Sequence, residues 1–401
     1  MNLLQEGIKQ KAVVRTTLTR KVTLDGVTIP YPVYRIRLDW LFYNNQNDRI
    51  ATWISQYEAQ HDGRSPDMSD REAYNAIIEE FIVASNPDAI KKTQTNIEMV
   101  DQREPGVVLA DGRIIDGNRR FTCLRRLAEK GERFNYFEAV IIDRDIEHNA
   151  KQIKMLELEI QHGEETKVSY NPVDRLVGVY RDIVESRLLT VEEYARSCNE
   201  TESEVRQRIE VAKLMVEFLE FINVPGQFHV ARDLQVYFPL EELSKMIRKC
   251  RPDDAEDLKI AVFNNILMQP ATDMTRFVRN IKAVIGSDYQ AEYLEEQRNL
   301  AAQVIDTLPP VGKMNTASIR DVVRTNDEVV QSLKLSMDKA LTRVKKKDTM
   351  NRPIQLAEKA TIFLEDIDIN IIRKMHDSEL RRLERQLDKL QERLMQIREM
   401  L

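Results

Sequence analysis

The chain has 401 residues and a net charge of −6 at pH 7. A chain of this length is too long for one typical hydrophobic core, which predicts two or three domains. The negative net charge excludes a general attraction to nucleic acid, so any such binding needs a local basic surface. Three widely spaced cysteines exclude a disulfide framework or metal knuckle, and without a long apolar segment we expect a cytoplasmic protein with no membrane partner.

The first domain predicted from the sequence is a small α+β domain over residues 20–146. Residues 22–41 alternate between apolar and polar side chains as strands do, and residues 70–97 have helical spacing. Two apolar runs at 107–115 turn at Ala110-Asp111-Gly112 and predict a hairpin, and residues 137–142 predict a further strand.

Residues 111–127 read DGRIIDGNRRFTCLRRL and form the most informative segment of the chain. A short strand ends at Asp116-Gly117-Asn118, and Arg119 and Arg120 then begin an apparent helix. A glycine turn before a basic helix start suits phosphate, because the backbone comes close and the first N–H groups lack helical partners. The same residues also fit an ordinary strand-to-helix corner with exposed arginines.

Strand signals nearly vanish after residue 147, which predicts a helical domain over residues 147–308. Asn171-Pro172 is expected to begin one of its helices. Residues 309–312 read PPVG and predict a linker to a helical C-terminal region over 309–401. In that region we expect helices near 324–346 and 353–364, then a long final helix.

A helix-turn-helix is predicted over residues 190–216. Thr190 and Thr201 each precede a helical pattern as N-caps, and Asn199 lies where a turn is needed. A structural helical hairpin has the same apolar spacing. If the second helix reads DNA, the residues expected to touch it are Thr201, Ser203, Arg206, Gln207 and Arg208.

Leucines and an isoleucine recur in steps of three and four from Leu380 to Leu401. This spacing predicts a coiled coil over residues 376–401, although a helix packed into its own domain would share it. A parallel dimer would place glutamate against glutamate and arginine against arginine, so we expect an antiparallel helix pair, either with a second chain or with an earlier helix of the same chain.

The order of these segments resembles the ParB family, which couples nucleotide binding to DNA binding. The resemblance spans residues 33–216 and rests on four segments. They are residues 36–49 with Ile36-Arg37-Leu38-Asp39 and Arg49, residues 104–120 with the glycine–arginine motif, residues 156–172 ending in Asn171-Pro172, and the helix-turn-helix. An insertion of about thirty residues near 60–90 departs from the family pattern.

The resemblance implies a ParB/sulfiredoxin-like N-terminal domain that binds CTP or another nucleoside triphosphate with Mg²⁺. It also implies a dimeric clamp or regulator on DNA, associated with the nucleoid or a plasmid, that is at most a slow nucleoside triphosphatase. The residues implied to hold the nucleotide are Asp116, Gly117, Asn118, Arg119, Arg120 and Glu159. Glu159 and Glu157 are the implied metal ligands, although the family's Glu and Arg are missing at their aligned places here.

Two other functions fit the same sequence. An enzyme on this scaffold, such as a phosphotransferase or nuclease, would use Asp111, Asp116, Glu157 or Glu159 as metal ligands or general base. An adaptor that has lost DNA contact would explain the acidic balance and the glutamates Glu202 and Glu204 on the second helix. Residues 217–375 have no predicted role beyond docking a system-specific protein partner.

Overall fold

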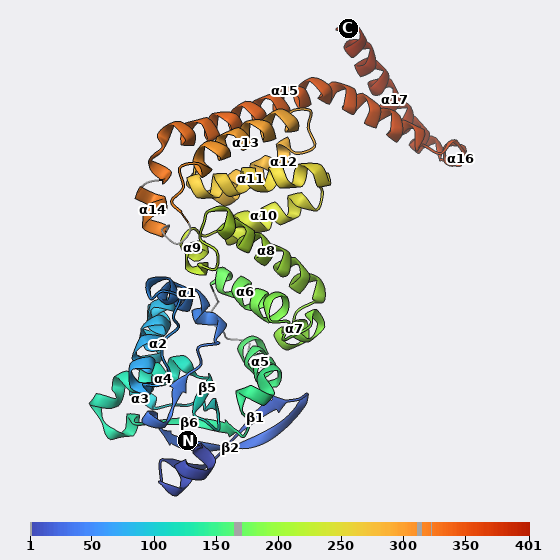
Figure 1. Ribbon diagram of the computed structural model, residues 1–401. Coiled ribbons are helices and arrows are strands. Elements are labelled where there is room, and N and C mark those ends of the chain that lie inside the picture. The colour runs from blue at the N-terminus through green and yellow to red at the C-terminus, as the bar shows by residue number, and fades with distance from the viewer. Residues whose placement is uncertain (1, 164–170, 311–314, 322) are drawn as a thin grey trace. The chain divides into compact units, whose positions relative to one another are not determined.

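The computed structural model describes residues 2–163, 171–310, 315–321 and 323–401 (Figure 1). The chain is an α+β protein with a six-stranded mixed sheet at its N-terminus and a mostly helical remainder, which confirms the fold class at this level. Contacts divide it into two compact units, Met1–Asp338 and Lys339–Leu401. The linker predicted at 309–312 lies partly outside the described residues.

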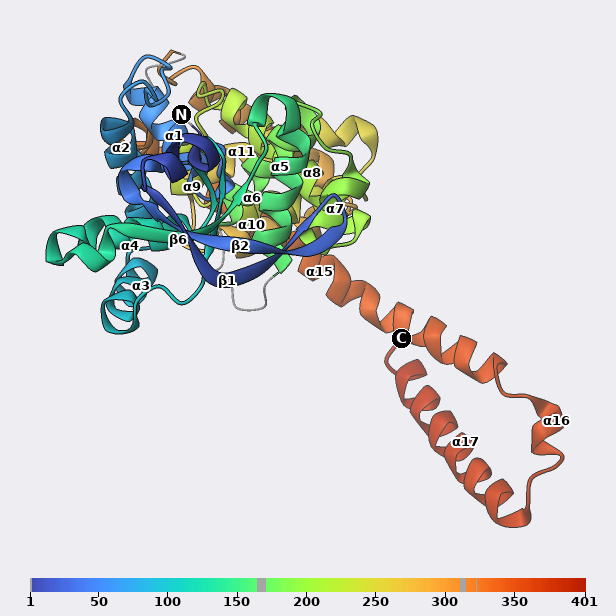
Figure 2. The same ribbon diagram turned by 90° about the horizontal axis from the view of Figure 1, so that it is seen from below.

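The sheet has the strand order β1-β2-β6-β4-β5-β3. Two of its strand pairs, β3 with β5 and β4 with β6, are parallel, and the others are antiparallel. The predicted hairpin at 107–115 is confirmed as β4 and β5. Figure 2 shows the long strands β1 and β2 side by side. The strand bounds are β1 Val13–Leu24, β2 Val27–Arg37, β3 Phe42–Tyr43, β4 Gly106–Leu109, β5 Arg113–Asp116 and β6 Tyr136–Ile142.

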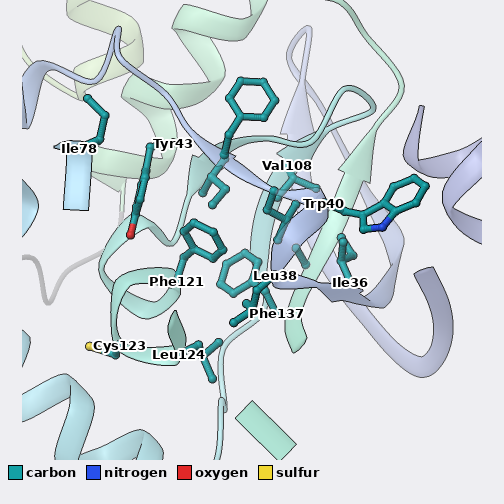
Figure 3. Close-up of a cluster of buried hydrophobic side chains, with 14 of the residues drawn as sticks. Ile36, Leu38, Trp40, Tyr43, Ile78, Val108, Phe121, Cys123, Leu124 and Phe137 are labelled. Atoms are coloured by element: carbon teal, nitrogen blue, oxygen red, sulfur yellow. The ribbon is translucent and has the colours of Figure 1, made fainter. Parts of the chain in front are cut away.

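Both faces of the sheet are covered. Alternate residues of each strand point to opposite faces and so join two different cores. Phe137 and Ile141 of β6 join a core with helices α1 to α4, while Val140 and Ile142 pack with Ile153 of helix α5 on the other face. Figure 3 shows the first of these cores. The four helices that contribute to it or cover it are α1 Ala51–Gln60, α2 Arg71–Ser85, α3 Pro87–Val100 and α4 Asn118–Leu127.

Helix α2 and the start of α3 lie in the segment near 60–90 that departs from the ParB pattern in the resemblance. The sequence predicted one helical stretch at 70–97, and the structure divides it at Asn86, which precedes Pro87. The Asp70 and Asn86 side chains accept hydrogen bonds from backbone N–H groups in the first turns of α2 and α3. Because proline fits the first turn but not a helix interior, Pro87 fixes the break.

The helical part of the first unit begins with α5, which is followed by the helix-turn-helix segment. Thr190 and Thr201 form capping boxes with Glu193 and Glu204, and Asn199 has a left-handed conformation, which confirms the predicted local geometry. The bounds are α5 Ile146–Gly163, α6 Pro172–Val179, α7 Val191–Cys198, α8 Glu202–Phe221, α9 Phe228–Asp233, α10 Tyr237–Ile247, α11 Pro252–Met268, α12 Met274–Val284, α13 Gln290–Ile305 and α14 Thr316–Asp321.

The second unit contains the C-terminal part of α15 Asp327–Glu365, the short α16 Ile369–Ile372 and α17 Asp377–Arg398. The two helices predicted at 324–346 and 353–364 are one helix with Pro353 inside it, so that prediction was wrong. This segment is exposed, and water can therefore solvate the carbonyl that proline leaves without a donor. The apolar face of α17 is also open, with Leu387 43% and Leu394 55% exposed.

Candidate functional site

The turn between β5 and α4 requires glycine. Gly117 has φ of +102° and is the N-cap of α4, and a Cβ placed on it would lie 2.7 Å from the Phe137 ring. Because no side chain caps this helix, the N–H groups of its first turn remain available to a ligand or to water. The backbone here therefore has the form that suits an anion.

A cavity of about 500 Å³ opens beside this turn. It is bounded by the turn at 115–120, by residues 47–50, by helices α2 and α3, by the loop at 101–104 and by Gln161 of α5. This volume falls in the range of pockets that hold small ligands and cofactors. Of the residues predicted to hold a nucleotide, Asp116, Gly117, Asn118, Arg119 and Arg120 all line it.

Arg119 is the most informative side chain of the cavity. It is half-buried, and within the described ranges the structure gives its guanidinium no carboxylate partner and no hydrogen bond. Burial, followed by the nearby Arg49 guanidinium, lowers the pKa of Arg119 below its ordinary value. Two arginines that approach each other at a cavity repel one another. An anion bound between them removes this repulsion and accepts hydrogen bonds from both guanidinium groups.

Arg120 and Asp116 are occupied differently. Arg120 donates to Asp116 at 3.0 Å and to the Glu104 carbonyl at 2.8 Å, and Arg20 of β1 donates to the same Asp116 oxygen at 2.8 Å. Asp116 thus joins β1 to the start of α4. These two residues lie at the cavity but already have partners, so they hold the turn in place.

Asn118 follows Gly117 as the first residue of α4. Its side-chain oxygen is buried and has no hydrogen-bond partner in the described part of the chain. A buried amide oxygen without a donor is costly, so a ligand that donates a hydrogen bond to Asn118 would be favoured here.

The two glutamates predicted as metal ligands do not come together. Glu159 lines a separate hollow beside Gly26 and Arg196, away from the residues of the cavity. Glu157 is 2% exposed and accepts a 2.9 Å hydrogen bond from Gln161, which does reach the cavity. Among the described residues, no cluster of three or more His, Cys, Asp or Glu side chains is arranged to hold a metal.

Glu157 belongs to a buried ionic network centred on Lys154 of α5. The Lys154 ammonium lies 2.8 Å from Asp48, 3.4 Å from Asp182 and 3.8 Å from Glu157. Burial acts to lower the pKa of Lys154, but the three carboxylates outweigh it and raise that pKa well above its ordinary value. Burial likewise raises the pKa values of Glu157 and Asp182, and this effect exceeds the opposing attraction of Lys154.

The residues predicted to touch DNA divide into two groups. Thr201, Ser203 and Arg206 are exposed at the start of α8, and Gln207 is half-buried. The Arg206 side chain is 62% exposed and bonds to Glu202 at 2.8 Å. Arg208 is only 12% exposed, because both Glu200 oxygens hold its guanidinium at 2.6 and 3.0 Å. Arg208 therefore has a structural contact that the sequence prediction missed.

Several cavity residues were not assigned a role from the sequence. The sequence predicts no ligand role for Arg49, Lys92, Arg103 or Gln161, although Arg49 and Gln161 lie in segments that carry the resemblance. These residues are spread over more than one hundred positions of the chain, from Arg49 to Gln161. The sequence contains no local signal that brings them to one cavity, apart from the segments of the resemblance that hold Arg49 and Gln161.

No protein-family model matches the chain, and no curated protein matches it significantly. In the described ranges no helix has the combination of length and apolar character that a membrane span requires.

Proposed function

We propose that the first unit binds a nucleoside triphosphate with its phosphates at Arg119 and Arg49. The observation that carries this proposal is Arg119 itself, a half-buried cation that lines the cavity beside a second arginine and has no anionic partner within the described residues. Protein charges are rarely buried without partners, and a polyphosphate would supply the missing charge.

The turn at Gly117 supports the same ligand. Its positive φ and the uncapped first turn of α4 present backbone N–H groups at the cavity, and the helix dipole adds a partial positive charge there. In this proposal the main role of Asp116 and Arg120 is to hold the turn, through contacts with Arg20 and Glu104, rather than to bind phosphate. Gly117 and Asn118 contribute backbone contacts.

We propose CTP as the nucleotide, in keeping with the resemblance to ParB proteins. The nucleotide phosphates would hold the magnesium ion, because this ion is usually bound through substrate phosphate oxygens and one or two carboxylates. The described cavity presents Asp101 and Glu104 as further carboxylates. Glu159, which lies in the separate hollow, takes no part in this arrangement.

The bound nucleotide is proposed to regulate DNA binding by α7 and α8. Helix α5 links the two sites, since Gln161 lines the cavity and Lys151 forms a 2.5 Å ion pair with Glu193 of α7. A change in the position of α5 would therefore reach the helix-turn-helix. The exposed start of α8, with Ser203 and Arg206, is the proposed DNA-facing surface.

A second copy of the chain is the proposed partner for the open apolar face of α17. An antiparallel arrangement brings the acidic end, with Glu379 and Glu384, near the basic end, with Arg393 and Arg398. The Leu387→Cys variant tests the orientation, with the wild type as the control for disulfides of the native cysteines. We expect no efficient disulfide between two copies at this position, and a fast, complete crosslink would show a parallel pair instead.

The nucleotide proposal is tested by titrating CTP, ATP, GTP and UTP with Mg²⁺ into the wild type and the Arg119→Ala variant. We expect the wild type to bind at least one of them, and Arg119→Ala to bind it at least tenfold more weakly. Arg126→Ala is the matched control on the same helix, since Arg126 pairs with Glu79 and does not line the cavity. No binding to the wild type would contradict the proposal.

A further inference from the structure

One wall of the cavity comes from helices α2 and α3. Residues of α2 and α3 and the cap between them reach it: Ile82, Ser85, Asn86, Lys92, Thr93, Asn96 and Ile97. Residues 82–86 of this wall lie in the segment near 60–90 that departs from the ParB pattern, and residues 92–97 follow that segment; the sequence predicted no role for either. Its placement makes it part of the same cavity as Arg119.

The position of the wall follows from how α3 is built. Ile90 and Ile97 are buried seven residues apart and fix one face of α3 in the core. Thr93 and Asn96 lie three and six residues after Ile90, so they are neighbours along one strip of the helix surface. That strip borders the cavity, and α3 packs closely against α4, which carries Arg119.

The chemistry of this wall differs from that of the arginine end. Among its described residues the only charged side chain is Lys92, and the rest are isoleucines, hydroxyls and amides. Ile50 adds a further buried apolar side chain next to Arg49. Apolar surface with a few hydrogen-bonding groups is typical of sites that hold the ring of a ligand, whereas phosphate needs cations and N–H donors.

We propose that the α2–α3 wall is a nucleoside subsite. Thr93 and Asn96 form hydrogen bonds to the polar edge of the heterocyclic base, and the exposed part of Ile82 contacts its face. Helices α2 and α3 therefore set which nucleotide the chain prefers. This inference rests on the proposed function, because it needs the phosphates to lie at Arg119.

The test separates the two ends of the site by comparing ligands with and without a nucleoside. Inorganic tripolyphosphate and the four nucleoside triphosphates, each with Mg²⁺, are titrated into the wild type, Thr93→Val and Asn96→Ala. Thr95→Val is the matched control, because Thr95 is exposed on the same helix and does not line the cavity. Circular dichroism confirms that each variant is folded.

We expect the preferred nucleotide to bind the wild type at least tenfold more tightly than tripolyphosphate. Thr93→Val and Asn96→Ala each lower its affinity about five- to tenfold and leave tripolyphosphate unchanged, since each removes one or two hydrogen bonds. Thr95→Val changes neither. Equal binding of tripolyphosphate and nucleotide, or nucleotide affinity that neither variant changes, overturns the subsite while the phosphate site stands. Failure of every nucleotide to bind the wild type overturns both.

Discussion

Lys154 donates a 2.8 Å hydrogen bond to Asp48, the residue directly before Arg49 of the cavity. Both side chains are buried, and they join α5 to the short 3-10 helix Asp48–Ile50. The Cβ of any larger residue in place of Gly178 would lie 2.7 Å from the Asp48 carboxylate, so α6 packs directly against this contact. The cavity beside Gly117 is thus tied to the helical part of the unit through a buried ion pair.

Replacement of Lys154 by methionine is expected to destabilise the protein by about 3–5 kcal/mol at pH 8, because it leaves Asp48, Glu157 and Asp182 buried without their cation. Urea denaturation of the wild type and the variant measures the loss. At pH 5.5 the loss should be smaller, since protonation removes the uncompensated charges. An equal loss at both pH values would contradict this account of the network.

The buried Asp174 is expected to make stability depend on pH. Burial raises the pKa of Asp174 to about 7, although hydrogen bonds from Thr52 and the charge of Arg232 oppose this shift. Between the ordinary pKa of aspartate and about 7, the folded chain then binds more protons than the unfolded chain. The free energy of unfolding contributed by this group therefore falls as pH rises through that window, and levels off above it.

The Asp174→Asn variant isolates this contribution. The difference in free energy of unfolding between variant and wild type should shift in favour of the variant as pH rises from 5 to 7.5, because the asparagine amide does not ionise. Subtraction removes the effect of other titrating groups such as His229, whose pKa burial lowers. A difference that stays constant over this range would show that Asp174 remains ionised in the folded chain.

Gly117→Ala is expected to cost about 1–3 kcal/mol of stability and to weaken nucleotide binding. An alanine there must adopt positive φ, and its Cβ would press on Phe137 and displace the first turn of α4. Gly131→Ala is the control, because a Cβ at Gly131 meets no atom within 4 Å. Thermal unfolding and CTP titration follow the two effects. Normal stability of Gly117→Ala would mean that the turn is not constrained as described.

Two arginines of α8 should respond differently to alanine substitution. Arg206→Ala is expected to weaken DNA binding at many sequences alike and to lower the slope of log affinity against log salt by about 1, because Arg206 is exposed. Arg208→Ala should instead destabilise the fold by about 1–3 kcal/mol, since it removes a two-oxygen contact with Glu200. Fluorescence anisotropy with labelled duplexes at several salt concentrations measures the first effect. If Arg206→Ala leaves DNA affinity unchanged, α8 does not contact phosphates there.

The features that could be predicted from the sequence are local ones. The hairpin at 107–115, the helix start after Gly117 and the capping boxes at Thr190 and Thr201 depend on residues only a few positions apart. Each of these residues also has a strong conformational preference, which a short segment expresses by itself.

The features that could not be predicted need partners far apart in the chain. Lys154 meets Asp48 across 106 residues, and nothing local in the sequence shows this ion pair. The resemblance implied Glu157 and Glu159 as metal ligands, whereas Glu157 belongs to the buried network around Lys154. Arg208 looked available for DNA because its partner Glu200 lies before α8 begins. The spacing of residues within the helix therefore does not reveal this contact. The sequence also does not reveal the cavity wall formed by α2 and α3, because the polar face of these helices resembles any solvated helix surface.

A crystal structure of the chain with CTP and Mg²⁺ tests the central claim most directly. The account predicts phosphate oxygens within hydrogen-bonding distance of the Arg119 and Arg49 side chains and of backbone N–H groups in the first turn of α4, with the base toward α2 and α3. A nucleotide bound with its phosphates elsewhere, while Arg119 remains unoccupied, would contradict it.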